Sequence, residues 1–116
     1  RIKGASGVFK KKGIKNFKVI ISPGIFEIPV IIARNIKKYD AFVDLGCVIK
    51  GETPHFNFIS KSTIDALAHL SITHKKPIGN GIITCFNKKQ AIERSRGKKN
   101  KGREAAKAVL SVLKNF

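Results

Sequence analysis

The sequence predicts an α/β fold in which helices cover both faces of a parallel sheet. Short apolar runs rich in β-branched residues alternate along the chain with longer segments of helical periodicity. The connections between them are short and carry glycine or proline, as at Pro23-Gly24. The apolar run 41–49 is bounded by glycine, which is typical of a strand buried on both faces. These observations together favour a layered sheet.

Three strands and five helices are expected. The strands are the Val-, Ile- and Phe-rich runs at residues 17–22, 41–49 and 78–86. Helical patterns cover residues 2–12, 26–38, 55–73, 88–96 and 101–114. Pro29 is compatible with the second helix only in its first turn, because proline lacks an N–H. A parallel sheet of three strands is narrow, so we expect that a strand is missing at the N-terminus.

Length and composition predict a single domain that spans residues 1–116. The hydrophobic content of 42% is enough for one core. No apolar run approaches the roughly 18 residues of a membrane span, so no membrane partner is expected. Cys47 and Cys85 lie in separate apolar runs without the spacing of metal ligands. Two buried thiols in a reducing cytosol are therefore expected, with a disulfide or a reactive thiol as the alternatives.

The net charge of +17 raises the question of a nucleic-acid partner, because very basic proteins often bind RNA or DNA. Nineteen of the 24 basic residues are lysine, whereas recognition of base edges favours arginine. The lysines are spread along the chain in pairs and are not interleaved with aromatic residues. We interpret them as solvated faces that also attract anionic substrates, and we expect no nucleic-acid partner. A basic RNA-binding protein is the remote alternative.

The segment 46–60, GCVIKGETPHFNFIS, carries the clearest chemical signal. Thr53 suits a helix N-cap and Pro54 the first helical position, where a missing N–H costs nothing. Free backbone N–H groups and the positive end of the helix dipole make such a start an anion site. His55 follows at once, with an ordinary pKa near 6.5 that suits proton transfer. The segment predicts a phosphate site beside an acid/base histidine.

Other candidates are weaker by themselves. Glu27 could recognise a polar heterocycle by hydrogen bonding, although carboxylates in the first turn of a helix more commonly just interact with the helix dipole. Phe26 could pack on a flat ring, but the sequence alone favours a core position. Arg94 and Lys101 are phosphate candidates among many basic residues. The Gly-Asn-Gly at 79–81 indicates either a close approach to the backbone or a bulge.

Five motifs, taken together, resemble the lumazine synthase family. They are PGIFEIP at 23–29, GCVIKGETPHF at 46–56, IGNGIIT at 78–84, NKKQAIERS at 87–95 and NKGREAA at 100–106. They follow the family's order at close to its spacing and cover nearly the whole chain. The resemblance implies a three-layer α/β/α sandwich with a parallel sheet of flavodoxin-like topology, whose first strand is missing from this chain.

The resemblance also implies a reaction. 5-Amino-6-(D-ribitylamino)uracil condenses with 3,4-dihydroxy-2-butanone 4-phosphate to 6,7-dimethyl-8-ribityllumazine, the penultimate step of riboflavin biosynthesis. Imine formation, phosphate elimination and ring closure need orientation, a proton shuttle and a phosphate clamp. No metal and no organic cofactor are expected, and the location is expected to be cytoplasmic.

Residue roles follow from the matched motifs. His55 matches the proton-transfer histidine. The phosphate would be held by Gly51, Glu52, Thr53, Arg94 and Lys101, with backbone N–H groups binding it and the Glu52 side chain turned away. The pyrimidine and ribityl groups would be bound by Ile25, Phe26, Glu27, Cys47, Val48, Ile49 and, from the neighbouring subunit, Asn80.

The resemblance implies an assembly in which each site crosses a subunit boundary. The expected form is a homo-pentamer, with a stacked decamer or an icosahedral 60-mer as larger forms, and riboflavin synthase is a further expected partner. Two departures stand out: Asn80 replaces an aromatic residue of many members, and the family's N-terminal strand with its stacking aromatic is absent. Our hypothesis is that these 116 residues are part of a longer active protein; an inactive assembly scaffold of the same fold is the alternative.

Overall fold

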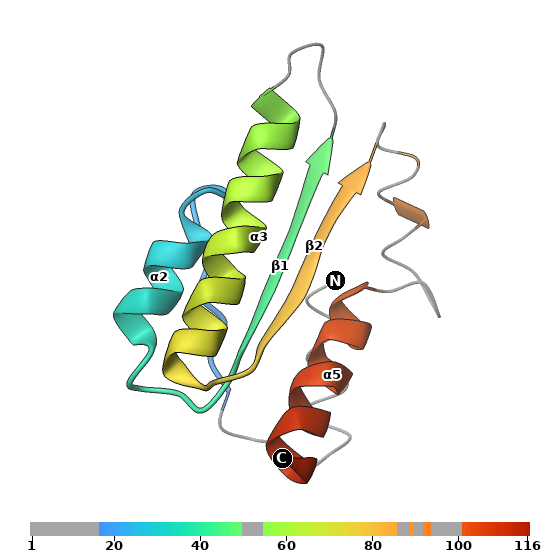
Figure 1. Ribbon diagram of the computed structural model, residues 1–116. Coiled ribbons are helices and arrows are strands. Elements are labelled where there is room, and N and C mark those ends of the chain that lie inside the picture. The colour runs from blue at the N-terminus through green and yellow to red at the C-terminus, as the bar shows by residue number, and fades with distance from the viewer. Residues whose placement is uncertain (1–16, 50–54, 86–88, 90–91, 94–100) are drawn as a thin grey trace.

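The computed structural model describes residues 17–49, 55–85, 89, 92–93 and 101–116 (Figure 1). The elements in chain order are α2 (Ile28–Asn35), β1 (Phe42–Ile49), α3 (His55–His74), β2 (Ile78–Cys85) and α5 (Lys101–Asn115). The expected helices 2–12 and 88–96 fall wholly or largely outside these residues.

The sheet is parallel, as predicted. Strand β1 pairs with β2 in a register that runs from Phe42 opposite Ile78 to Ile49 opposite Cys85. Helix α3 connects the two strands, as a parallel pair requires a crossover.

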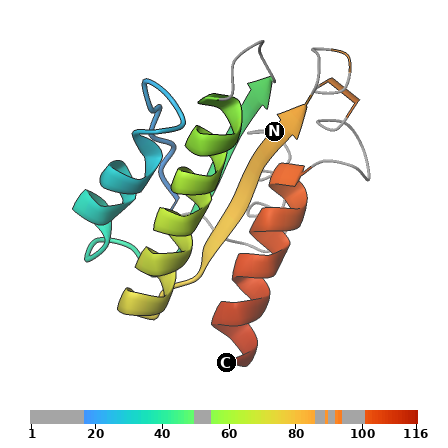
Figure 2. The same ribbon diagram turned by 45° about the horizontal axis from the view of Figure 1, so that its top comes forward.

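Helices lie on both faces of this sheet, which confirms the predicted α/β fold class (Figures 1 and 2). One face carries α2 and α3, whose apolar side chains form a buried cluster with β2 that includes Ile32, Leu67 and Ile82. The other face carries α5, where Ala106 is fully buried against Val43 and Leu45 of β1. Alternate residues of each strand thus point to opposite layers.

The Gly-Asn-Gly segment is explained by the close approach of α5. An ideal Cβ at Gly79 would lie 2.5 Å from the carbonyl oxygen of Ala105 and 2.8 Å from Val109 Cγ2. The strand register continues without an extra residue through this segment, so the bulge alternative is wrong. Glycine is needed here because a side chain would push the helix off the sheet.

The predicted strand at 17–22 is wrong. Residues from Phe17 to Ser22 have no regular secondary structure, and Val19 and Ile21 are 52% and 87% exposed. Within the described residues the sheet has two strands, β1 and β2. The preference of Val and Ile for strands is realised through packing and pairing with a neighbouring strand, and neither of the two described strands pairs with this segment as part of the sheet.

Helix boundaries differ little from the sequence expectation. Helix α2 is shorter than predicted because it begins at Ile28, after Glu27 at the N-cap, which places Pro29 in the first turn as expected. Helix α3 ends in a left-handed residue, Lys75, with φ of 54°. In the described part of the chain, no helix is both long and apolar enough to span a bilayer.

Candidate functional site

The carboxyl ends of the two parallel strands form one edge of the sheet. Ile49 and Cys85 end β1 and β2 side by side, and α3 begins at His55 beyond the end of β1 (Figure 1). In open α/β sheets, ligands bind outside such strand ends. This edge is therefore the candidate active site.

The loop before α2 lies against β1 close to this edge. An ideal Cβ at Gly46 would lie 3.1 Å from both Cδ1 and Cγ1 of Ile25. The absence of a side chain at Gly46 therefore makes room for Ile25. A backbone hydrogen bond of 3.1 Å from Ile28 N–H to the Ile25 carbonyl closes the turn. The fold thus brings together Ile25 and Gly46, which belong to two separate sequence motifs.

The two residues after Ile25 have different environments. Phe26 is 65% exposed, so the core position that the sequence alone favours is wrong. Glu27 folds back over Gly24, whose ideal Cβ would lie 3.4 Å from Glu27 Oε2. That oxygen is buried and has no hydrogen-bond partner among the described residues. An aromatic ring open to solvent and an unpaired carboxylate oxygen on one turn suit recognition of a polar heterocycle.

The strand end contributes side chains to both layers. Val48 packs against the cluster beneath α2 and α3. Cys47 is half-buried, rather than buried as predicted, and its thiol is free. For Ile49 only the backbone is described. Ile25 and Val48 pack on the same apolar cluster, so the two predicted pyrimidine-binding segments are neighbours in space.

The predicted proton-transfer and phosphate residues are only partly described. His55 is the first residue of α3, but its side chain lies outside the described residues. Gly51, Glu52, Thr53 and Arg94 also lie outside them, as does Pro54.

Two further predicted residues lie on other elements. Lys101 begins α5, and its Nζ lies 3.7 Å from Glu104 Oε2 in a half-exposed ion pair. Asn80 is opposite Asp44 in the sheet, five residue pairs before the strand ends. Its Oδ1 accepts a hydrogen bond of 3.0 Å from Ile82 N–H. Within one chain, the structure does not bring Asn80 to the edge where Cys47 lies.

Asp44 is a chemically distinctive residue that our sequence analysis missed. It lies in the middle of β1, is 4% exposed, and accepts a hydrogen bond of 3.2 Å at Oδ1 from Gly81 N–H. Burial raises the pKa of this carboxyl from 3.8 to about 7, and the hydrogen bond from Gly81 offsets part of the rise. The signal was present as a single charged residue within an apolar strand, FVDLGCVI.

Among the residues that the structure describes, no group of three or more His, Cys, Asp or Glu side chains is arranged to hold a metal ion. His69 and His74 are both exposed on α3.

Comparison with known proteins agrees with the sequence motifs. The family model for 6,7-dimethyl-8-ribityllumazine synthase matches residues 2–116. A protein of that name from Bartonella bacilliformis is 44% identical over 115 residues, which cover 95% of this chain and 75% of the relative. One from Campylobacter jejuni is 39% identical, covering 97% and 76%, and one from Nitrobacter hamburgensis is 40% identical, covering 97% and 74%. The family expected from the five motifs is thereby confirmed: this chain belongs to the 6,7-dimethyl-8-ribityllumazine synthase family.

Proposed function

We propose that this protein catalyses the reaction for which its family is named. 5-Amino-6-(D-ribitylamino)uracil and 3,4-dihydroxy-2-butanone 4-phosphate condense to 6,7-dimethyl-8-ribityllumazine, with loss of phosphate and water, in riboflavin biosynthesis. The observation that carries the proposal is the packing of Ile25 on Gly46 in a chain of this family. This contact holds the motif at 23–29 against the motif at 46–56, near the carboxyl ends of the strands.

The pyrimidine and ribityl groups are bound by the loop and the strand end. Phe26 offers an exposed ring, and Glu27 offers a carboxylate oxygen without a described partner to a ring N–H or a ribityl hydroxyl. Cys47, Val48 and Ile49 line the strand side of the pocket. Orienting both reactants in this way supplies much of the rate enhancement of a condensation.

The start of α3 and the loop before it bind the phosphate and provide the group that transfers protons. Backbone N–H groups of Gly51, Glu52 and Thr53 bind the phosphate, because a helix N-terminus attracts anions. Arg94 and Lys101 complete the clamp, the arginine by bidentate hydrogen bonds. His55 transfers protons during imine formation and phosphate elimination.

The site is completed by a second copy of the chain, in a homo-pentamer that stacks or closes into larger shells. Asn80 of one subunit would contact the pyrimidine bound to the next. Two observations support this arrangement. Asn80 lies well before the carboxyl end of β2, away from the site of its own chain, and α3 exposes apolar side chains. Phe58 and Ile72 are 68% and 78% exposed there, which is costly unless another surface covers them. The enzyme works in the cytoplasm and associates with riboflavin synthase.

The test is turnover by the 116-residue chain itself. The chain is mixed with both substrates, and the lumazine product is followed by its absorbance, with the assembly state measured in parallel. Product formation supports the enzyme. A folded and assembled chain that forms no lumazine supports the inactive scaffold, whereas steeply salt-dependent RNA binding without turnover supports the RNA-binding alternative.

A further inference from the structure

Two basic turns lie together at the end of the sheet where the strands begin. The lysines are spread along the sequence, but the turn after α2 carries Lys37-Lys38 and the turn after α3 carries Lys75-Lys76. These turns lead into β1 and β2, which begin side by side with Phe42 opposite Ile78. Both turns therefore lie at the end of the sheet opposite the candidate active site (Figures 1 and 2).

Lys76 joins the two turns. Its Nζ donates one hydrogen bond to the carbonyl oxygen of Ile36 and another, of 3.0 Å, to the carbonyl oxygen of Tyr39. These oxygens belong to the end of α2 and the turn after it, where the carbonyl groups of a helix lack partners within the helix. Lys76 therefore satisfies the end of α2 and holds the two turns in a fixed arrangement.

Four other cations are exposed at this end of the sheet. They are Arg34, Lys37, Lys38 and Lys75, which we call the basic edge. None of the four forms a salt bridge with another described residue. Asp40 is the one carboxylate among residues 33–41 and 73–77, so the charge of the two turns is strongly positive. An anionic partner would therefore be attracted to them.

Lys75 occupies a position that is unfavourable for lysine. Its φ of 54° lies in the left-handed region, where the Cβ of a side chain is strained and glycine is favoured. Strained backbone positions cluster at sites where a protein binds a ligand or changes state. An exposed lysine at a strained position, beside further cations, indicates that its charge has a use other than stabilising the fold.

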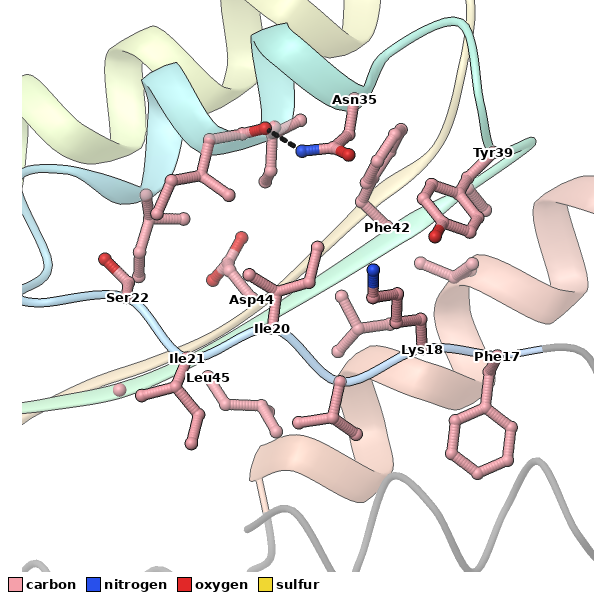
Figure 3. Close-up of a pocket in the computed structure, with 18 of the residues that line it drawn as sticks. Phe17, Lys18, Ile20, Ile21, Ser22, Asn35, Tyr39, Phe42, Asp44 and Leu45 are labelled. Carbon is pink, nitrogen blue, oxygen red and sulfur yellow. Dashed lines mark hydrogen bonds between the residues drawn. The ribbon is translucent and has the colours of Figure 1, made fainter.

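The two turns present charge without an apolar or aromatic anchor. No large apolar side chain among residues 33–41 and 73–77 is exposed. The ring of Tyr39 is half-buried and packs edge-to-face on Phe42, with ring centroids 6.0 Å apart (Figure 3). A folded partner usually needs anchors that become buried, and a single-stranded nucleic acid needs exposed rings on which bases stack. An extended acidic segment needs neither, because charge complementarity attracts it.

We propose that the basic edge docks an extended acidic segment of a partner protein, whose Asp and Glu side chains pair with its lysines. The segment lies across the turns after α2 and α3, which Lys76 holds together. Because this end of the sheet is opposite the candidate active site, the partner and the substrates can bind at the same time. The inference concerns an interaction surface and does not depend on the proposed reaction.

The experiment measures binding of a fluorescently labelled glutamate dodecamer to the 116-residue chain by fluorescence anisotropy, with a neutral Gly/Ser peptide of equal length as the background. The glutamate peptide should bind at low salt and dissociate as salt is added, because exposed charges are screened. The triple variant Lys37→Gln/Lys38→Gln/Lys75→Gln should bind it about tenfold more weakly, since each exposed ion pair contributes modestly.

A second triple variant controls for net charge. Lys61→Gln/Lys89→Gln/Lys107→Gln removes the same charge from exposed positions elsewhere on the surface. It should weaken binding by less than about twofold, because these lysines act on the basic edge only at a distance and through screening salt.

Lys75→Gly tests one residue of the basic edge separately. This variant should bind the glutamate peptide more weakly while its melting temperature rises, because it loses a charge and relieves backbone strain together. If the first triple variant does not fold, unchanged binding in Lys75→Gly is sufficient to reject the proposal.

Other outcomes also overturn it. The proposal fails if the glutamate peptide does not bind at low salt, or if both triple variants lose the same affinity, which would leave only the net charge of the chain. It also fails if a uridine dodecamer binds the basic edge more tightly than the glutamate peptide does, since the edge would then be a nucleic-acid site.

Discussion

Asp44 of β1 and Gly81 of β2 are joined by a hydrogen bond in which the backbone N–H of Gly81 donates to Asp44 Oδ1 at 3.2 Å. The bond links neighbouring strands in the buried middle of the sheet, where Asp44 is 4% exposed. The second carboxyl oxygen has no partner among the described residues. One oxygen of this carboxyl group is therefore hydrogen-bonded, while burial of the group makes its ionisation unfavourable.

Stability should fall as the pH rises from about 4 to about 7. The pKa of Asp44 is raised from 3.8 to about 7 in the folded chain, so the folded state binds more protons than the unfolded state between these values. The proton-binding difference then makes the free energy of unfolding decrease with pH in that window and level off above it. The contribution is at most about 4 kcal/mol, measured by urea unfolding at a series of pH values. Asp44→Asn should flatten the curve, while the exposed Asp40→Asn should not.

Gly79→Ala should destabilise the fold. The new Cβ would lie 2.5 Å from the backbone oxygen of Ala105, which cannot move without shifting α5. Overpacking of this kind costs about 1–3 kcal/mol, measurable by denaturant unfolding. Gly24→Ala is the matched control, because its Cβ would meet only the flexible Glu27 carboxyl group at 3.4 Å. Equal losses in both variants would contradict the role assigned to α5.

Lys75→Gly should stabilise the fold. Lys75 has φ of 54° after the end of α3, and hydrogen bonds from Lys75 N–H to Ile72 O and from Lys76 N–H to Ser71 O close a Schellman turn around it. A side chain in this left-handed conformation costs about 1 kcal/mol, which glycine removes. The melting temperature should therefore rise in Lys75→Gly. It should stay nearly unchanged in Lys75→Ala, which keeps the strain, so a similar rise in both would point to charge instead.

His55→Ala should slow turnover by at least about 100-fold, the usual contribution of a general acid–base group. Assembly, followed by sedimentation, should not change. His69→Ala is the control from the same helix, since His69 is exposed and should leave the rate unaltered. Unchanged turnover in His55→Ala would remove the proposed proton-transfer role.

Arg94→Ala should raise KM for the phosphorylated substrate about 10- to 100-fold, because a charge-assisted hydrogen bond to an anion is lost. The value for the pyrimidine substrate should change little. Arg34→Ala, on the exposed side of α2, controls for the loss of one positive charge. An effect confined to the pyrimidine substrate would place Arg94 in a different part of the site.

Much of the site's framework is predictable from local chemistry. The apolar run 41–49 predicted β1 because a strand buried on both faces needs apolar residues in succession. Pro29 predicted the start of α2 within one turn, since proline cannot donate a helical hydrogen bond. The order of the five motifs predicted the family, which the comparisons confirm.

Other features depend on contacts between distant residues. The β-branched segment at 17–22 has the composition of a strand, but a strand requires a paired neighbour, and neither described strand of the sheet pairs with it. Phe26 is apolar yet exposed, because its position on a turn sets its direction.

By itself, the sequence determined the α/β class, the boundaries of β1, α3, β2 and α5 to within one residue, and the family. Only the tertiary structure decided that Gly79 makes room for α5, that Ile25 rests on Gly46, and that Asp44 is buried with one oxygen unpaired. The physical reason is the separation along the chain of the residues that interact. Periodicity and capping act between residues a few positions apart, whereas desolvation of a carboxyl group and close approach of backbones depend on segments that meet only when the layers pack.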